Sequence, residues 1–164
     1  MNWPLIHIQI NHFPIVLTVV GSAVLLLALF VRQRVIWIYA LATLTLAGLS
    51  VGPVYFAGDQ AGDAVEHTWY IVHDAVNTHE DAAIFALIWI LLMGVASAYT
   101  WWRMVKREPL SLPPTWLRVV VAVLAAFGVS TVIRTAYLGG KIVHESPKLV
   151  TPPAGVVQPP NKAP

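Results

Sequence analysis

Cysteine is absent from this 164-residue chain, and charged residues are scarce, at 11% of the sequence. Without cysteine there can be no disulfide bond, no thiolate metal site and no covalently attached c-type haem. Any cofactor must therefore be held by nitrogen or oxygen ligands. Hydrophobic residues make up 57% of the chain and its mean hydropathy is +0.69, so the composition excludes an ordinary soluble domain and predicts an integral membrane protein.

Four apolar segments are long enough to cross about 30 Å of hydrocarbon as α-helices. They are Phe13–Val31, Val35–Ala57, Ala82–Trp102 and Trp116–Leu138. We therefore predict an all-α, up-down-up-down four-helix transmembrane bundle over residues 1–145, with no internal repeat of 20–50 residues. A short amphipathic helix at residues 61–75 is expected to lie on the membrane surface between the second and third crossings. Residues 146–164 are rich in proline and are expected to form an extended periplasmic tail.

Lysine and arginine are missing from residues 1–31 and 59–81. Basic residues lie instead in the first and third turns between crossings, among them Arg32, Arg34 and Arg103. The positive-inside rule then predicts a multi-pass protein of the bacterial inner (cytoplasmic) membrane with both termini periplasmic. Because the ten basic residues are spread along the chain and form no basic face, we expect membrane lipids as partners and no nucleic acid.

All six histidines fall on the same predicted side of the membrane. His12 and His79 lie at the outer mouths of the first and third crossings, which are diagonal in a simple up-down bundle. Imidazole is a good ligand for haem iron, copper and zinc, so these two histidines are candidate axial ligands of a b-type haem or candidate ligands of another metal ion. Plain hydrogen bonding of both histidines at the membrane interface is the alternative.

Further polar residues are candidates for supporting roles around this pair. His7, His73 and His144 are candidates for a second ligand pair, and hence a second haem, or for a metal site nearer the water. Arg134 is expected either to pair with a haem propionate or to extend its guanidinium towards the interface. Asp59 is a candidate hydrogen-bond partner that would orient a ligand imidazole.

Two local motifs also carry predictions. The Gly48–Gly52 spacing allows close approach of helix backbones, within the chain or between copies of it. Thr78 to Asp81 resembles a capping box, which would place His79 in the first turn of the third crossing.

Four motifs together point to a known family. They are the sequence H-F-P-I at His12–Ile15, Gly58-Asp59 at the end of the second crossing, His79, and Gly139-Gly140-x-Ile-Val closing the fourth. With them the chain resembles the DUF2231 family of bacterial four-helix membrane proteins over about residues 5–147. Some members of that family carry fused Rieske or c-type cytochrome domains, so the resemblance implies electron transfer. His144 departs from the family pattern, because it stands where the family has tyrosine.

The sequence thus predicts a b-type cytochrome-like electron-transfer subunit, with haem near the periplasmic face. It would pass electrons between a quinol or a membrane partner and a periplasmic redox protein, most simply within a larger complex. One alternative is a membrane protein that binds copper or another divalent ion through the same histidines with Asp59 or Glu80. The other alternative is a structural subunit of a membrane complex that holds no cofactor.

Overall fold

The computed structural model describes residues 1–65, 73–106 and 112–145. Helices account for nearly all of these residues. They are α1 (Trp3–Ile10), α2 (His12–Val31), α3 (Arg34–Val65), α4 (His73–Lys106) and α5 (Thr115–Glu145). Together they make four spans long and apolar enough to cross a membrane, because α1 and α2 share the first span. The predicted all-α, multi-pass membrane fold is confirmed.

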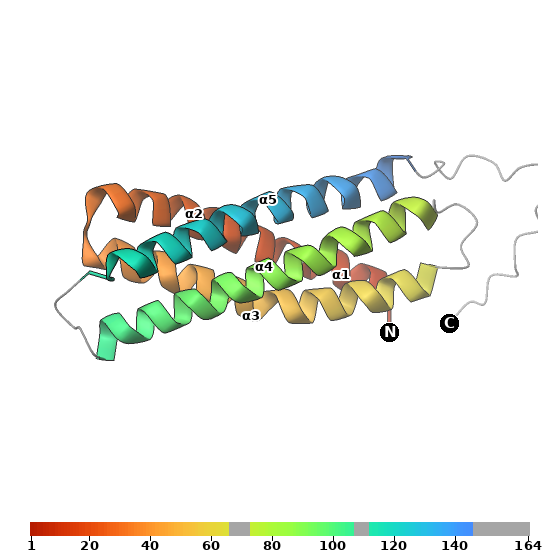
Figure 1. Ribbon diagram of the computed structural model, residues 1–164. Helices are drawn as coiled ribbons and strands as arrows, with labels where there is room; N and C mark the ends of the chain where they lie inside the picture. Colours follow the sequence, from red (N-terminus) through yellow and green to blue (C-terminus); the bar gives the residue numbers. More distant parts are fainter. Residues whose placement is uncertain (66–72, 107–111, 146–164) are drawn as a thin grey trace, which may run out of the picture.

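The helices pack as an up-down-up-down bundle (Figure 1). Neighbouring pairs are α2–α3, α3–α4, α4–α5 and α5–α2, so that α2 and α4 lie diagonally, while the short α1 packs against α3. One end of the bundle carries the N-terminus, the end of α3, the start of α4 and the end of α5. We name it the histidine end, because His7 and His79 lie there, and we name the opposite end, with Arg34 and Arg118, the arginine end.

Helices α3 and α4 extend well beyond the predicted crossings. At 1.5 Å per residue, α3 with 32 residues and α4 with 34 are about 48 and 51 Å long, against about 30 Å of hydrocarbon. Residues 61–65 continue α3 and residues 73–75 begin α4, so both ends of the predicted surface helix belong to longer helices. Residues 66–72 lie outside the described ranges, as does the predicted tail at 146–164.

The predicted capping box at Thr78 is wrong. Because α4 already begins at His73, Thr78 lies inside the helix, and its hydroxyl donates to the carbonyl of Asp74 at 2.6 Å. A threonine within a helix commonly bonds the carbonyl one turn back in this way. His79 consequently lies in the second turn of α4 and not in the first.

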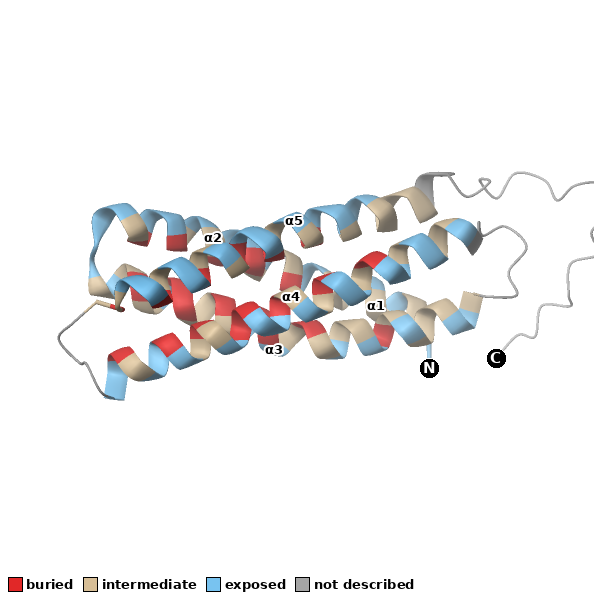
Figure 2. Cartoon of the chain, viewed as in Figure 1, coloured by how far each residue is buried: buried red, intermediate tan, exposed pale blue. Residues whose placement is uncertain are grey.

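Buried residues form a stripe along the inward face of each helix, as Figure 2 shows. Large side chains on these inward faces include Trp37, Leu44, Ile90, Met93 and Val121, all at most 1% exposed. The outward faces carry large apolar side chains that are exposed, which is the pattern of a bundle surrounded by lipid. This apolar outer surface agrees with the membrane assignment.

Helices α3 and α4 cross in backbone contact. A Cβ built on Gly48 would lie 2.7 Å from the Cα of Gly94, and the reverse holds for Gly94. Gly48 therefore serves packing within the chain, one of the two roles expected for its motif. Nothing lies within 4 Å of a Cβ built on Gly52, the other glycine of that motif.

At the arginine end, arginine side chains connect the helices through hydrogen bonds to backbone carbonyls and a cation–π contact. The guanidinium of Arg34 donates to the carbonyl of Met104 at 2.9 Å, which joins the start of α3 to the end of α4. Arg118 donates to the carbonyl of Pro113 and lies over the ring of the buried Trp37, 5.9 Å from its centroid. Arg32 ends α2 in the left-handed conformation, with φ of 55°, and so permits the very short turn to α3.

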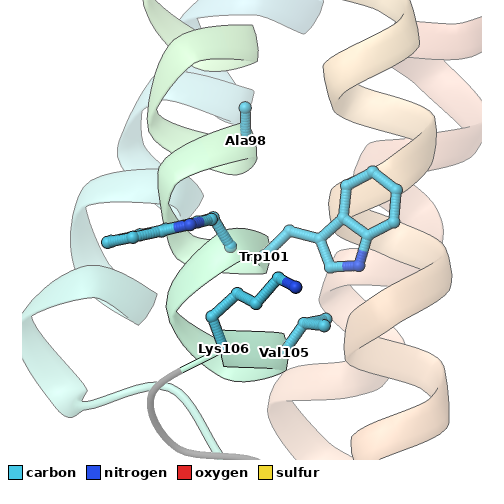
Figure 3. Close-up of a pocket in the computed structure, with 5 residues that line it drawn as sticks. Ala98, Trp101, Val105 and Lys106 are labelled. Carbon is cyan, nitrogen blue, oxygen red and sulfur yellow. The ribbon is translucent and has the colours of Figure 1, made fainter.

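The end of α4 carries aromatic and cationic side chains on its outer face. Trp101, Trp102 and Lys106 line a shallow hollow of about 240 Å³ there, and Figure 3 shows the two rings extending to different sides of the helix. Tryptophan and lysine at the end of a membrane-spanning helix are typical interfacial anchors. The hollow is therefore explained by the position of α4 at the membrane boundary.

Candidate functional site

The short helix α1 is positioned by its first residues. The side chain of Asn2 accepts a hydrogen bond from the amide of Leu5 at 3.2 Å, and Pro4 favours the start of a helix. Trp3 packs edge-on against Phe56 of α3, with ring centroids 5.6 Å apart and planes at 89°. These contacts dock α1 onto α3 and turn His7 towards that helix.

The imidazole of His7 lies half-buried against α3. Its Nδ1 is 3.2 Å from the carbonyl oxygen of Val54. The ring also lies over Gly58, where an added Cβ would come within 2.9 Å of the imidazole Cε1. A glycine at position 58 is therefore what lets the ring come this close to the helix backbone.

The imidazole of His79 is held in the same manner by α5. Its Nδ1 is 3.0 Å from the carbonyl oxygen of Thr135, and its ring lies over Gly139, where a Cβ would be 3.0 Å from Cε1. The hydroxyl of Thr135 donates to the carbonyl of Ala82 at 3.1 Å and fixes α5 against α4 at this level. In both cases the glycine follows the accepting carbonyl by four residues, which is one helical turn.

His7 and His79 lie close enough to each other to interact electrostatically. Because a carbonyl oxygen only accepts, Nδ1 must carry the proton in both rings. The neutral imidazole then keeps a free lone pair on Nε2. A histidine whose Nδ1 proton is bonded to a backbone carbonyl is in the tautomer that binds a metal through Nε2.

His12 is the first residue of α2, and its side chain is exposed. His7 and His79, in contrast, are partly buried, and each ring lies against a neighbouring helix. His12 follows His7 by five residues, which is about 140° of rotation around a helix of 3.6 residues per turn, so the two side chains leave the first span in different directions.

Other predicted site residues lie apart from this pair or beyond the described side chains. Arg134 is exposed and lines a hollow of about 120 Å³ between α4 and α5, together with Ala82, Phe85 and Thr131. Asp59 is exposed, and the orienting role foreseen for it is filled by backbone carbonyls. His73 and His144 lie in α4 and α5, but their side chains, like all of His67, are outside what the structure describes.

Among the described residues, no three side chains of histidine, aspartate or glutamate lie together in a way that could hold a metal ion. Glu80, a candidate ligand, is exposed and lies over Gly62 of α3. The site on which chemistry can be argued is thus the pair of His7 and His79.

Comparisons of the chain with models of protein families, with curated proteins and with solved structures give no match. The resemblance to the DUF2231 family therefore stays a prediction, based on the four sequence motifs given above.

Proposed function

We propose that the protein is a membrane-embedded, b-type cytochrome-like electron-transfer subunit that holds one haem between His7 and His79. A haem needs only two protein ligands, because the porphyrin supplies four nitrogens to the iron. When bound, it supplies one-electron transfer. The chain's own contribution is to hold the two imidazoles, fix their tautomer and surround the site with apolar helices.

The observation that carries this proposal is that hydrogen bonds hold both imidazoles in the tautomer that can bind a metal. Each lies over a glycine and bonds a backbone carbonyl through Nδ1, so that Nε2 keeps its lone pair. The glycine gives each ring access to the backbone carbonyl, and the resulting hydrogen bond leaves the Nε2 lone pair available to a metal. This shared tautomer is what supports ligation over plain interfacial hydrogen bonding.

The position of the site near one end of the bundle supports a role in electron transfer. His7 contacts α3 at Gly58, immediately before the exposed acidic residues Asp59 and Asp63. The site thus lies where the apolar sequence gives way to a charged, water-facing end. We propose that this end is periplasmic in a bacterial inner membrane, and that electrons pass here between a quinol or membrane partner and a periplasmic redox protein.

The test is a dithionite-reduced minus oxidised absorption spectrum of the purified protein, expressed with adequate haem supply. We expect an α band in the native protein that is lost in His7→Ala and in His79→Ala. His12→Ala is the matched control, because His12 lies on the same span but is exposed, and it is expected to keep the band.

Two results would overturn parts of the proposal. A colourless native protein would reject the haem hypothesis. The next measurement would then be metal analysis, which tests the alternative of copper or another divalent ion. If no metal is found and the histidine variants still assemble with their partners, the structural-subunit reading stands. An α band that survives in His7→Ala but is lost in His12→Ala would move the axial ligand to His12.

A further inference from the structure

The two histidines occupy corresponding positions in two halves of the chain. His79 follows His7 by 72 positions. Their carbonyl partners, Val54 and Thr135, and the glycines beneath their rings, Gly58 and Gly139, are each separated by 81 positions. The first half is the hairpin of α1, α2 and α3, and the second half is the hairpin of α4 and α5.

The same 72-residue offset relates the buried faces of α2 and α4. The buried residues of α2 are Pro14, Thr18, Gly21, Leu25 and Ala28. Adding 72 to each number gives residues of α4 that are all buried, Ala86, Ile90, Met93, Ser97 and Thr100. The two helices therefore turn the same face inward, in the same register, although their side chains differ.

The 81-residue offset likewise relates α3 to α5. Four buried positions of α3 correspond to four buried positions of α5. The pairs are Ala40 with Val121, Leu44 with Ala125, Ala47 with Gly128 and Val51 with Val132. A polar detail repeats as well, because the hydroxyls of Ser50 and Thr131 each donate to the carbonyl three residues before them, at 2.9 and 3.0 Å.

We infer that the bundle is an internal two-fold repeat of helical hairpins, and that its pseudo-two-fold axis runs along the bundle between His7 and His79. The first and third spans run in the same direction, so the axis is parallel to the helices, as in other membrane proteins built from parallel repeats. Residues related by the axis lie on opposite sides of it. A single cofactor on the axis is then held by two equivalent imidazoles.

This inference rests on the proposed function for the identity of the cofactor, but the equivalence of the two halves stands on the helices alone. With a cofactor on the axis, the inference gives one haem for each chain, where the sequence left room for two. It also makes Gly58 and Gly139 equivalent in function, since each supports one ligand ring.

The experiment compares mirrored substitutions, Gly58→Ala and Gly139→Ala. Each adds a methyl group that displaces the imidazole above it, so both are expected to lower the haem content by similar factors, within about two-fold of each other. Gly52→Ala and Gly140→Ala are matched controls, one in each half, because a Cβ at either position meets nothing within 4 Å. The native protein is expected to contain one haem per chain by pyridine haemochrome assay.

A second measurement on the haem-free protein separates this inference from the proposed function. The thermal midpoints of the two mirrored variants, each relative to its own control, are expected to fall by similar amounts whether or not haem is ever bound. A one-sided loss, in haem content or in thermal midpoint, would overturn the equivalence of the two halves. Two haems per chain would overturn the placement of a single cofactor on the axis. Equal shifts in a protein that never binds haem would uphold the repeat and reject only the haem.

Discussion

The two hairpins agree at the histidine end and differ at the middle of the bundle. Helices α3 and α4 meet there through Gly48 and Gly94, but the corresponding residues, Val129 of α5 and Ser22 of α2, carry side chains. The packing of α2 on α5 is accordingly less extensive than that of α3 on α4. The two halves therefore match at the histidine–glycine contacts and along their buried faces, and they differ at the closest helix crossing.

The largest expected effect is at the glycine crossing. Gly94→Ala places a methyl group against the Cα of Gly48, and backbone cannot rotate away as a side chain can. We expect a loss of about 3 kcal/mol in the free energy of unfolding, measured in detergent. The mirror substitution Ser22→Ala removes a buried hydroxyl that has no hydrogen-bond partner among the described residues, so stability is expected to hold or rise slightly. Equal losses in both variants would contradict the difference between the two helix contacts.

Arg34 provides the next contrast, at the arginine end. Arg34→Ala removes the charged hydrogen bond to the carbonyl of Met104, and we expect a loss of about 2 kcal/mol in unfolding free energy. Its counterpart in the second hairpin is the exposed Thr115, where Thr115→Ala is expected to change stability by about 0.5 kcal/mol or less. Comparable losses in the two variants would show that the Arg34 bond adds little.

Thr135 offers a way to make the two hairpins more alike. Thr135→Val removes the hydroxyl bond to Ala82 and is expected to lower stability by about 1 kcal/mol. The mirror substitution, Val54→Thr, offers a hydroxyl to the carbonyl of Ile10, which lacks its helical donor because Pro14 has no N–H. We expect Val54→Thr to stabilise the protein by up to about 1 kcal/mol. A destabilised Val54→Thr protein would mean that the first hairpin cannot accept the same bond.

The smallest effect is expected at Arg134, which corresponds to Pro53. Both residues are exposed, so Arg134→Leu is expected to change the unfolding free energy by no more than about 0.5 kcal/mol and to leave the haem content unchanged. The measurement is thermal unfolding together with the reduced minus oxidised spectrum. A lower haem content at unchanged stability would instead place the guanidinium at a propionate.

Hydrophobic length and turn spacing sufficed to predict the four spans and their order, because a membrane forces each long apolar run into a helix. The helix ends were less predictable. Gly58 follows Ala57 directly, but it does not adopt the left-handed conformation that commonly ends a helix, so α3 continues to Val65 and includes part of the expected surface helix. The first crossing was expected to begin at Phe13, whereas α1 precedes α2 and extends that span back to Trp3.

The partner of His79 was not identified from the sequence. His7 lies at the same end of the bundle as His79 because Trp3 and Phe56 dock α1 onto α3, and such an arrangement of residues distant in the chain has no local sequence signature. One signal was present nonetheless. Gly58 and Gly139 were both noted as family motifs, and each lies at the level of a histidine on the preceding span. A search for histidines facing glycines would have chosen His7 over His12.

Each ligand histidine is fixed entirely within its own hairpin, His7 by α3 and His79 by α5. During synthesis the first hairpin can therefore enter the membrane and orient its imidazole before the second hairpin has left the ribosome. Docking of two finished hairpins is then the step that completes the site. In such an order of assembly, a haem bound as proposed would join the two hairpins and hold the bundle closed.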